Sequence, residues 1–413
     1  MNVAYQYPLP STPSESTLLR HASRIARIDI LSDVAAAEPA WRSLAAGDAL
    51  ATPYQRYEWI ALWQKHVGRA EGIRPFIAVG YDAGNNPLFI LPFGREKLGP
   101  FTVGRFFGGK HATLNTGIWR RDLAQTVTAD EMKDILARIS GHDVDLLMLF
   151  NQPETWRDLR NPLALLPHQP SSDQNSRLDL IKPGEETVKR QISATMRGRL
   201  RTKERKLAKL KGYRYRHVSA PDDVTRCLDA FFIQKAARLE AQGLDNVFAR
   251  PGIEAFVRAA CGNGLNAGEP VIELHALEAD GELLALFAGT CDEYRFTSMF
   301  NSYTLGENAR WSPGLILLIH LVKNCADRDI ATFDVGPGNA RYKTFFCKEH
   351  EKLFDSFLPL SARGHVLATA LRQAYSAKRR IKNAPALWSA ISGIRRAFGK
   401  SVDRNGAAHP EAD

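Results

Sequence analysis

The sequence predicts an α/β (α+β) protein in which one plan of helices and mixed sheet occurs twice. The 413 residues fit two or three domains of about 100–200 residues each. Segments 76–96 and 271–293 share one pattern: an apolar strand, an acidic-glycine turn and a second apolar strand. Their offset is about 195 residues, and each has helices before it and a helix and buried strand after it. This repetition indicates internal duplication, although any two α/β domains can share a hairpin.

The first half is predicted to contain helices, a hairpin and a buried strand. Its expected strands span 26–31, 75–82, 87–96 and 145–150, and its expected helices span 33–46, 53–67 and 128–139. Apolar residues recur at helical spacing in the helices and run together in the strands. Ser32-Asp33 can cap the first helix, and Gly84-Asn85-Asn86 can form the hairpin turn. Residues 151–177 contain four prolines and predict a loop-rich boundary between the halves.

The second half repeats this order. Its expected helices span 187–210, 221–240, 251–261 and 312–327, and its expected strands span 213–218, 331–336 and 354–360, with three antiparallel strands within 271–301. A helical period continues from 366 to about 398. The predicted organisation is therefore a disordered N-terminus (1–24), a first repeat (25–182), a second repeat (183–362) and a basic helical tail (363–413).

Composition narrows the class of protein. Hydrophobic residues make up 44% of the chain and charged residues 24%, which predicts a packed core. Five cysteines, none in a CxxC pair, argue against a disulfide framework or a structural zinc site, so no metal is expected. No apolar stretch approaches membrane-spanning length, and residues 1–24 lack a signal-peptide core. These features predict a cytoplasmic enzyme or binding protein.

The net charge of +10 is unevenly placed. Residues 182–216 contain 13 Lys/Arg against 3 Glu, and residues 363–413 contain 10 basic against 3 acidic residues. The remainder is mildly acidic, whereas a nucleic-acid-binding protein more often has a basic face throughout, so no nucleic acid is expected. A local basic patch favours an anionic cofactor, a phosphorylated substrate or a lipid surface. A solvated helix packed by one apolar stripe is the simpler reading of 193–211.

Ser312-Pro313-Gly314-Leu315 is the first candidate binding segment. Serine is a good N-cap and proline a good first helical residue, and glycine lets another group approach the exposed N–H groups. Such a helix start can bind phosphate oxygens through its N–H groups and dipole. A well-made helix start without a ligand explains the same residues equally well.

The segment 333–343 (FDVGPGNARYK) is the second candidate. A buried strand brings Asp334 to its end, where a glycine turn follows, and such strand ends often carry site residues. Asp334 can act as a general base, and Lys343 can neutralise a phosphate or polarise an acyl oxygen. A loop-capping aspartate and a solvated lysine are the alternative. Of two other candidates, His320 on the apolar helix is expected in the core, and His111 is a weaker candidate substrate residue.

At these residues the sequence resembles a known family. The basic helix MRGRLRTKERKLAKLKG, the hairpin LEADGELLALFAG, the helix start SPGLILL and the segment FDVGPGNARYKTFF are similar to the acetyltransferase domain of cellulose-biosynthesis (CelD-like) proteins. These belong to the GCN5-related N-acetyltransferase (GNAT) superfamily, as do the Fem-type aminoacyl transferases. TPYQRYEWIALWQ and FILPFGRE resemble that family's amino-terminal repeat, so the resemblance covers about residues 25–360.

The resemblance implies a tandem duplicated GNAT fold and an acyl donor, acetyl-CoA, bound where a central strand parts from its neighbour. Here that strand is 294–301 and the next helix starts at 312–315. Backbone N–H groups near Asn301 would stabilise the oxyanion. Donor phosphates would bind the N–H groups of the helix start, with help from a nearby arginine; the implied donor-binding residues are Asn301, Arg310, Ser312, Gly314, Leu315 and Arg341. The usual superfamily pyrophosphate loop is absent, because GENARWSPG (306–314) occupies its place.

The implied function is transfer of an acyl group from acetyl-CoA to an amine or hydroxyl, with Asp334 and Lys343 as catalytic residues. A saccharide acceptor in cellulose or exopolysaccharide production is implied by the family alone. Two alternatives remain open: Fem-type transfer from aminoacyl-tRNA, and a non-catalytic accessory protein of a polysaccharide synthase. In the latter, the basic tail would contact the inner-membrane surface as an interfacial helix.

Overall fold

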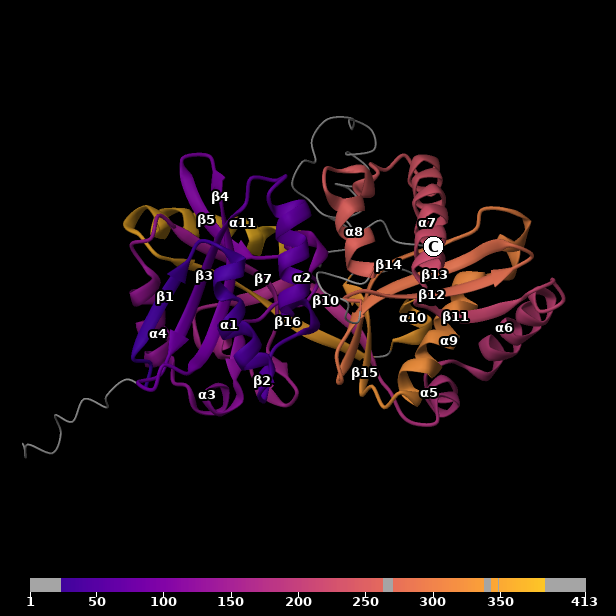
Figure 1. Cartoon of the computed structure of the whole chain (residues 1–413), viewed down its shortest axis with the longest axis horizontal. Helices are drawn as coiled ribbons and strands as arrows, with labels where there is room; N and C mark the ends of the chain where they lie inside the picture. Colours follow the sequence, from indigo (N-terminus) through magenta and orange to yellow (C-terminus); the bar gives the residue numbers. More distant parts are fainter. Residues whose placement is uncertain (1–23, 263–269, 338–342, 348, 383–413) are drawn as a thin grey trace, which may run out of the picture.

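The computed structural model describes residues 24–262, 270–337, 343–347 and 349–382. Two sheets with flanking helices lie side by side, one from the first half of the chain and one from the second (Figure 1). Their strands join into a single 14-stranded sheet. Among these residues, no helix has the length and apolar character that crossing a membrane requires.

The first repeat contributes the strand order β1-β3-β4-β5-β7. Asp33 caps α1 as expected, accepting a hydrogen bond from the Ala35 N–H. The strands are β1 Arg27–Leu31, β2 Ala49–Leu50, β3 Arg74–Tyr81, β4 Pro87–Leu98, β5 Phe101–Phe106, β6 Ile118–Arg120, β7 Leu146–Pro153, β8 Thr155–Trp156, β9 Leu159–Arg160 and β10 Gln169–Asp179. The helices are α1 Val34–Ala45, η2 Pro53–Gln55, α2 Tyr57–Trp63, η3 Gln64–Gly68, η4 Gly109–His111, α3 Arg121–Thr126, α4 Ala129–Ile139 and η5 Pro162–Leu165.

The second repeat contributes the equivalent order β11-β12-β13-β14-β15, so the predicted tandem duplication is confirmed. The strands are β11 Arg214–Val218, β12 Glu273–Ala279, β13 Glu282–Cys291, β14 Arg295–Tyr303, β15 Thr332–Pro337 and β16 Glu349–Pro359. The helices are α5 Gly184–Gln191, α6 Ala194–Leu207, α7 Pro221–Ala241, η6 Val247–Ala249, α8 Ile253–Cys261, η7 Glu307–Trp311, α9 Pro313–Asp327, α10 Lys343–Phe346 and α11 Ala362–Lys382.

Two strands connect the repeats, because each pairs with a strand of the other repeat. β10 is the last strand of the first repeat in sequence but pairs with β15 of the second, whereas β16, the last strand of the second repeat, pairs with β7 of the first. β10 and β16 also pair with each other, which closes the continuous sheet. The prediction of a loop-rich boundary at 151–177 is therefore wrong in part, because this segment contains the end of β7, all of β8 and β9, and most of β10. Its Gln, Ser, Asp and Asn residues have low strand propensity, and its neighbours on both sides supply the pairing.

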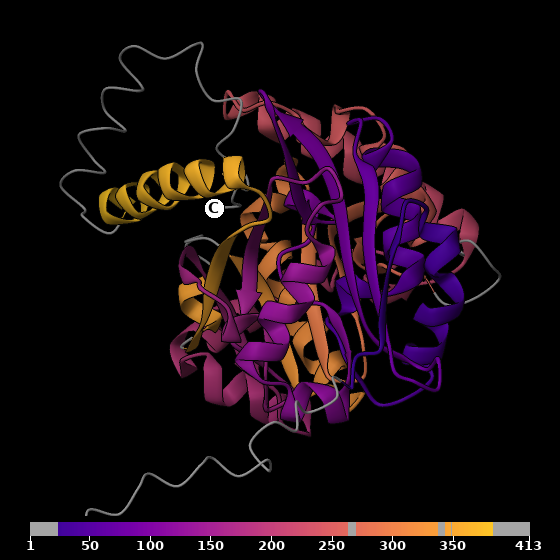
Figure 2. The same ribbon diagram turned by 90° about the vertical axis from the view of Figure 1, so that its left-hand side faces the viewer.

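Helix packing also crosses between the repeats. One hydrophobic core includes residues of α1, α2, α7 and α8, and Trp59 of α2 contacts Phe256 of α8 edge-to-face at 5.3 Å between ring centroids. A second core lies under α9, where Leu200 and Leu207 of α6 are buried as their helical spacing predicts. Figure 2 shows α11 on the opposite side of the strands from the indigo helices α1 and α2. The expected helix at 53–67 is interrupted into η2, α2 and η3.

Gly252, the residue before α8, makes a close contact between the repeats. Its φ is +79°, and a Cβ there would overlap the carbonyl oxygen of His66 in η3. We expect Gly252→Ala to lower the free energy of unfolding by about 2–4 kcal/mol, measured by urea denaturation. Gly243→Ala is the matched control, because Gly243 has a φ of +66° but open space around it. It should cost only about 1–2 kcal/mol. Equal losses would show that backbone strain, and not the contact between repeats, sets the requirement for glycine.

Candidate functional site

The two central parallel strands of the second repeat part soon after they pair. β14 and β15 are in register only through Arg295–Thr332, Phe296–Phe333 and Thr297–Asp334. β14 then runs on to Tyr303, while β15 ends at Pro337, after Gly336 with its left-handed φ of +82°. In the first repeat β5 and β7 also pair briefly, over two residue pairs. The opening beyond Thr297 and Asp334 is where the sequence predicted the donor site.

β14 contains a β-bulge at this opening, and the bulge changes the face of the sheet on which the following β14 side chains lie. The register against β13 shifts between Ala288–Phe300 and Gly289–Ser298, which leaves Met299 as the extra residue. Phe296 consequently lies in the core under α9, whereas Phe300 lies in the core shared with α7 and α8. Bulges re-aim side chains next to functional sites, and here the bulge precedes Asn301.

The start of α9 lies against the end of β14. Gly314 packs on Tyr303, because a Cβ at Gly314 would lie 3.3 Å from the Tyr303 ring. Ser312 is the N-cap residue of α9, as expected, but it adopts left-handed angles (φ 55°, ψ 53°) and its side chain makes no capping hydrogen bond. Its hydroxyl instead accepts a hydrogen bond from Lys203 Nζ at 2.7 Å. The N–H groups of Leu315 and Ile316 both donate to the Ser312 carbonyl at 3.2 Å.

The basic helix α6 therefore borders this helix start. Lys203 links the two, while the predicted Arg310 is exposed with its guanidinium 5.0 Å from the Trp311 ring centroid. The predicted Arg341 lies outside the described residues. Positive side chains beside the α9 N-terminus and its dipole give a suitable environment for phosphate oxygens.

Two buried cations of α7 were missed by sequence reasoning. Lys235 is 6% exposed, and its Nζ donates to the Asn301 carbonyl at 3.2 Å. Burial and then the nearby Arg238 lower the pKa of Lys235 to about 8. The Arg238 guanidinium lies 4.2 Å from the ring centroid of Tyr303. Lys235 and Arg238 are three residues apart on the helix face that also carries Phe231, and this pattern could have indicated that they are buried. Charged residues on an amphipathic helix usually lie in solvent, so the pattern alone did not predict it.

Asp334 is completely buried at the strand opening. Its carboxylate accepts hydrogen bonds from Asn175 Nδ2 at 2.7 Å and from the Gly336 N–H at 2.6 Å. Arg295 Nη1 lies 4.0 Å from it. Burial raises the pKa of Asp334 to about 6, although Arg295 and the two hydrogen bonds act in the opposite direction. A carboxyl group with such a pKa can exchange a proton near neutral pH.

Arg295 organises the charges around Asp334. The guanidinium forms a two-pronged pair with Glu351 of β16 at 2.7 and 3.1 Å, and Nε donates to Thr332 Oγ1 at 3.0 Å. It lies 4.3 Å from the ring centroid of Trp156, which belongs to β8 of the first repeat. The cluster therefore sits at the seam between the repeats. Sequence reasoning missed it because its members come from β8, β14 and β16.

The two predicted catalytic residues contact the backbone of the same residue, Gly336. The Gly336 N–H donates to Asp334, and the Gly336 carbonyl accepts from Lys343 Nζ at 3.4 Å. Lys343 is 7% exposed. The structure thus brings Asp334 and Lys343 together, while Asn301, Ser312, Gly314 and Leu315 lie along the other strand and the following helix.

Several buried oxygens beside Asp334 have no hydrogen-bond partner among the described residues. They are Thr290 Oγ1, Thr297 Oγ1 and Asn175 Oδ1, and all three residues are fully buried. Thr290 is paired with Thr297 across the β13–β14 ladder, and Thr297 with Asp334 across the β14–β15 ladder. Unsatisfied buried oxygens are costly, so this row is suited to hydrogen-bond donors of a substrate or of water.

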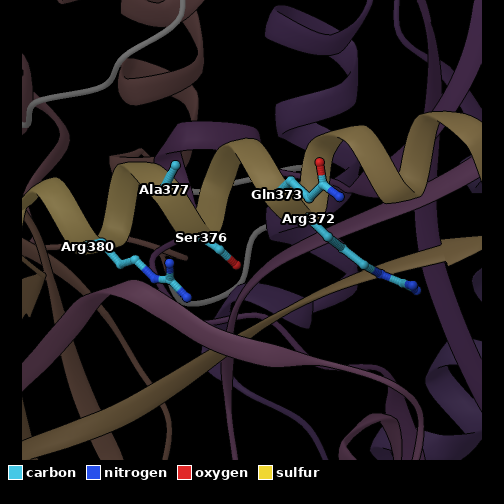
Figure 3. A pocket seen from close by; sticks show the side chains of 5 residues that line it. All are labelled: Arg372, Gln373, Ser376, Ala377 and Arg380. Atoms are coloured by element: carbon cyan, nitrogen blue, oxygen red, sulfur yellow. The ribbon is translucent and has the colours of Figure 1, made fainter.

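The remaining sequence candidates lie elsewhere. His111 accepts a hydrogen bond from Trp63 Nε1 at 3.1 Å and its ring is 6.4 Å from that of Phe256, so it lies where the first repeat meets α8. The prediction of a core His320 is wrong: its side chain is 30% exposed and pairs with Glu204 at 2.6 Å. A hollow beside α11, shown in Figure 3, is lined by none of the predicted site residues; it is lined by Arg372, Gln373, Ser376, Ala377 and Arg380.

Residues 194–344 match the family model of an acetyltransferase (GNAT) domain. This range begins with α6 and ends in α10, and so contains the strand opening, the α9 start and Asp334. The chain therefore carries a GNAT acetyltransferase domain, which identifies it as an acyltransferase. No curated protein matches the sequence.

Solved structures share the fold at low sequence identity. The crystal structure of FemX matches with a TM-score of 0.56 at 9% identity, over 80% of this chain and 97% of that chain. A conserved protein of unknown function from Bacteroides thetaiotaomicron matches with a TM-score of 0.52 at 10% identity, over 80% of this chain and 100% of that chain. Identities this low establish the fold alone, so the resemblance to cellulose-biosynthesis proteins stays a prediction.

Proposed function

We propose that this protein transfers an acyl group, most simply acetyl, from acyl-CoA to an amine or hydroxyl acceptor. The observation that carries the proposal is the parting of β14 and β15 directly beyond Thr297 and Asp334, with α9 starting beside the end of β14. A thioester placed in that opening would have its carbonyl near the backbone at Asn301 and its phosphates near the α9 start. Backbone N–H groups at Asn301 would then stabilise the oxyanion.

The donor end of the site is supported by its charge. Lys203 joins the basic helix α6 to Ser312, so a cation lies beside the start of α9 and the proposed phosphate-binding residues Gly314 and Leu315. Arg310 and Arg341 are the further candidates for phosphate contact. Acetyl-CoA as the specific donor rests on the resemblance and on the GNAT domain match, because the segment 306–314 lacks the usual pyrophosphate pattern.

The acceptor end is supported by Asp334 and its neighbours. The acceptor nucleophile attacks the thioester carbonyl, its proton passes to Asp334 directly or through water, and the CoA thiolate leaves. Lys343 would neutralise charge on the acyl oxygen or on the leaving group. The first repeat, which places Trp156 over Arg295, would shape the acceptor groove. A saccharide or carrier-linked sugar of cellulose or exopolysaccharide synthesis is the acceptor that the resemblance favours.

Binding of the donor tests this proposal. Isothermal titration of acetyl-CoA and of free CoA should show micromolar affinity, weakened at least about tenfold, or about 1.4 kcal/mol, by Gly314→Glu. The added carboxylate would repel phosphate and press on Tyr303. Gly47→Glu is the matched control, since Gly47 is exposed after α1 in the first repeat and a Cβ there would come no closer than 3.6 Å to another residue. If wild type and Gly314→Glu bind CoA with equal affinity, the donor phosphates do not bind at the start of α9.

Fem-type transfer from aminoacyl-tRNA is the second candidate, and the exposed basic residues of α6 favour it. α5 and α6 span Gly184–Gln191 and Ala194–Leu207, a short pair for a tRNA-binding arm. Failure of acetyl-CoA and CoA to bind, with acylation from aminoacyl-tRNA, would establish it.

A non-catalytic accessory protein of a polysaccharide synthase is the third candidate. Its basic tail, which begins in α11, would hold it at the membrane surface. Loss of vesicle co-sedimentation on deleting 364–413 would support that reading.

A further inference from the structure

Three side chains able to ligate a metal meet at the outer edge of the second repeat's sheet. His217 lies on the edge strand β11, and Glu273 and His275 lie two residues apart on β12. His217 and His275 are directly paired across the antiparallel ladder, so all three side chains share one face. One ligand atom from each lies within 4.8 Å of the other two.

The distances are close to those of a metal tetrahedron. Zinc bonds of about 2.0–2.1 Å place tetrahedral ligands about 3.3 Å apart. His275 Nε2 lies 3.4 Å from Glu273 Oε2, and His217 Nε2 lies 4.0 Å from the same oxygen. A small rotation of His217, whose side chain is 42% exposed, would complete the set. That exposure also leaves a fourth position open to water.

The surrounding residues hold two of the ligands in place. The Tyr215 hydroxyl lies 2.9 Å from His275 Nδ1, so an Nδ1–H donated to it leaves the Nε2 lone pair directed at Glu273. Arg328 donates to both Glu273 oxygens at 2.7 and 2.9 Å. Such outer contacts orient metal ligands, and ligating carboxylates are commonly hydrogen-bonded in this way. Arg328 alone also explains why a partly buried Glu273 is charged, so evidence for metal binding must come from the two histidines.

We propose that His217, Glu273 and His275 bind one divalent transition-metal ion, with Zn²⁺ as the best match. Two imidazoles and one carboxylate form the donor set of many zinc sites with an open position. The site lies three strands from β15, about 14 Å away at the usual strand spacing, and is separate from the acyl-transfer residues. A bound ion would fasten the edge strand β11 to β12.

Titration of chelator-treated full-length protein with Zn²⁺, and with Co²⁺ followed by visible absorption, tests the site. We expect one ion per chain and Co²⁺ bands typical of a four-coordinate site with nitrogen ligands. His217→Ala should weaken binding at least about tenfold. This variant should fold, because the His217 side chain is exposed and stacks on His275 at 4.8 Å between ring centroids.

His320→Ala is the control, because His320 stacks on Tyr215 from the α9 side but contributes no ligand atom to the set. It should bind Zn²⁺ with wild-type affinity and stoichiometry. Wild-type protein that binds no Zn²⁺, or a His217→Ala variant that binds it as tightly as wild type, would overturn the proposal. Equal weakening by both variants would also overturn it, since that result points to the aromatic stack and not to ligation.

Discussion

Replacing Asp334 with asparagine is expected to lower turnover by about 10²–10⁴-fold while changing donor affinity by less than about twofold. Asparagine can still accept the hydrogen bond from the Gly336 N–H, but it cannot take a proton. The wild-type rate should rise with pH through about 6, because the carboxylate form of Asp334 is the active one and its pKa is about 6. The variant should lack this limb in its pH–rate profile.

Asp355→Asn provides the matched control. Burial also raises the pKa of Asp355 to about 6. This residue lies on β16, accepts a hydrogen bond from the Asn151 N–H of β7, and is outside the proposed site. Its replacement should leave the low-pH limb in place. If turnover falls equally in both variants, or if Asp334→Asn keeps the limb, another group accepts the proton.

The same ionisation should appear in stability. The pKa of Asp334 is raised on folding from 3.8 to about 6, so the folded state favours the protonated form. Its contribution is present in full below pH 4 and is lost as pH rises to about 6. Wild-type protein should therefore lose unfolding free energy over this window relative to Asp334→Asn, which can be measured by urea denaturation at several pH values.

Arg295→Met is expected to lower the free energy of unfolding by about 3–5 kcal/mol. The guanidinium is 1% exposed and balances two acids, Glu351 at 2.7 Å and Asp334 at 4.0 Å. Methionine fills much of the same volume but leaves both carboxylates without their buried cation. Urea denaturation at pH 7 measures the loss, and the pKa of Asp334 in the variant should move further upward because Arg295 lowers it.

Arg177→Met separates this effect from a general loss of positive charge. Arg177 also pairs with Glu351, at 3.6 Å, but its side chain is 29% exposed, so its removal should cost at most about 1 kcal/mol. Similar costs for the two variants would mean that Glu351 and Asp334 are solvated or protonated in the folded protein, and that the cluster is not held by Arg295.

The elements that define the fold were predictable because their signals are local. The hairpin β3–β4 and the strands β12 to β14 are apolar runs separated by turn residues, and α9 follows a clear start signal. Asp334 and Lys343 lie within one segment of 11 residues, so their proximity could be inferred from the strand and its glycine turn. β5 was missed because FTVGRF is short and contains one glycine and one arginine.

The contacts between distant segments could not be predicted in this way. Asn175 reaches Asp334 only because β10 changes repeats, and no pattern in its polar sequence indicates that pairing. Lys235 and Arg238 resemble the exposed charges of any amphipathic helix. Glu273 and His275 lie more than fifty residues after His217, which is outside the spacing of recognised metal motifs.

The exchange of β10 and β16 has a consequence for synthesis of the chain. β7 ends at Pro153, but its partner β16 begins only at Glu349. At a translation rate of about 5–20 residues per second, β7 leaves the ribosome roughly 10–40 s before that partner exists. During this interval the edge of β7 presents unpaired backbone groups, so the nascent first repeat is expected to need protection by a chaperone until the second repeat has been made.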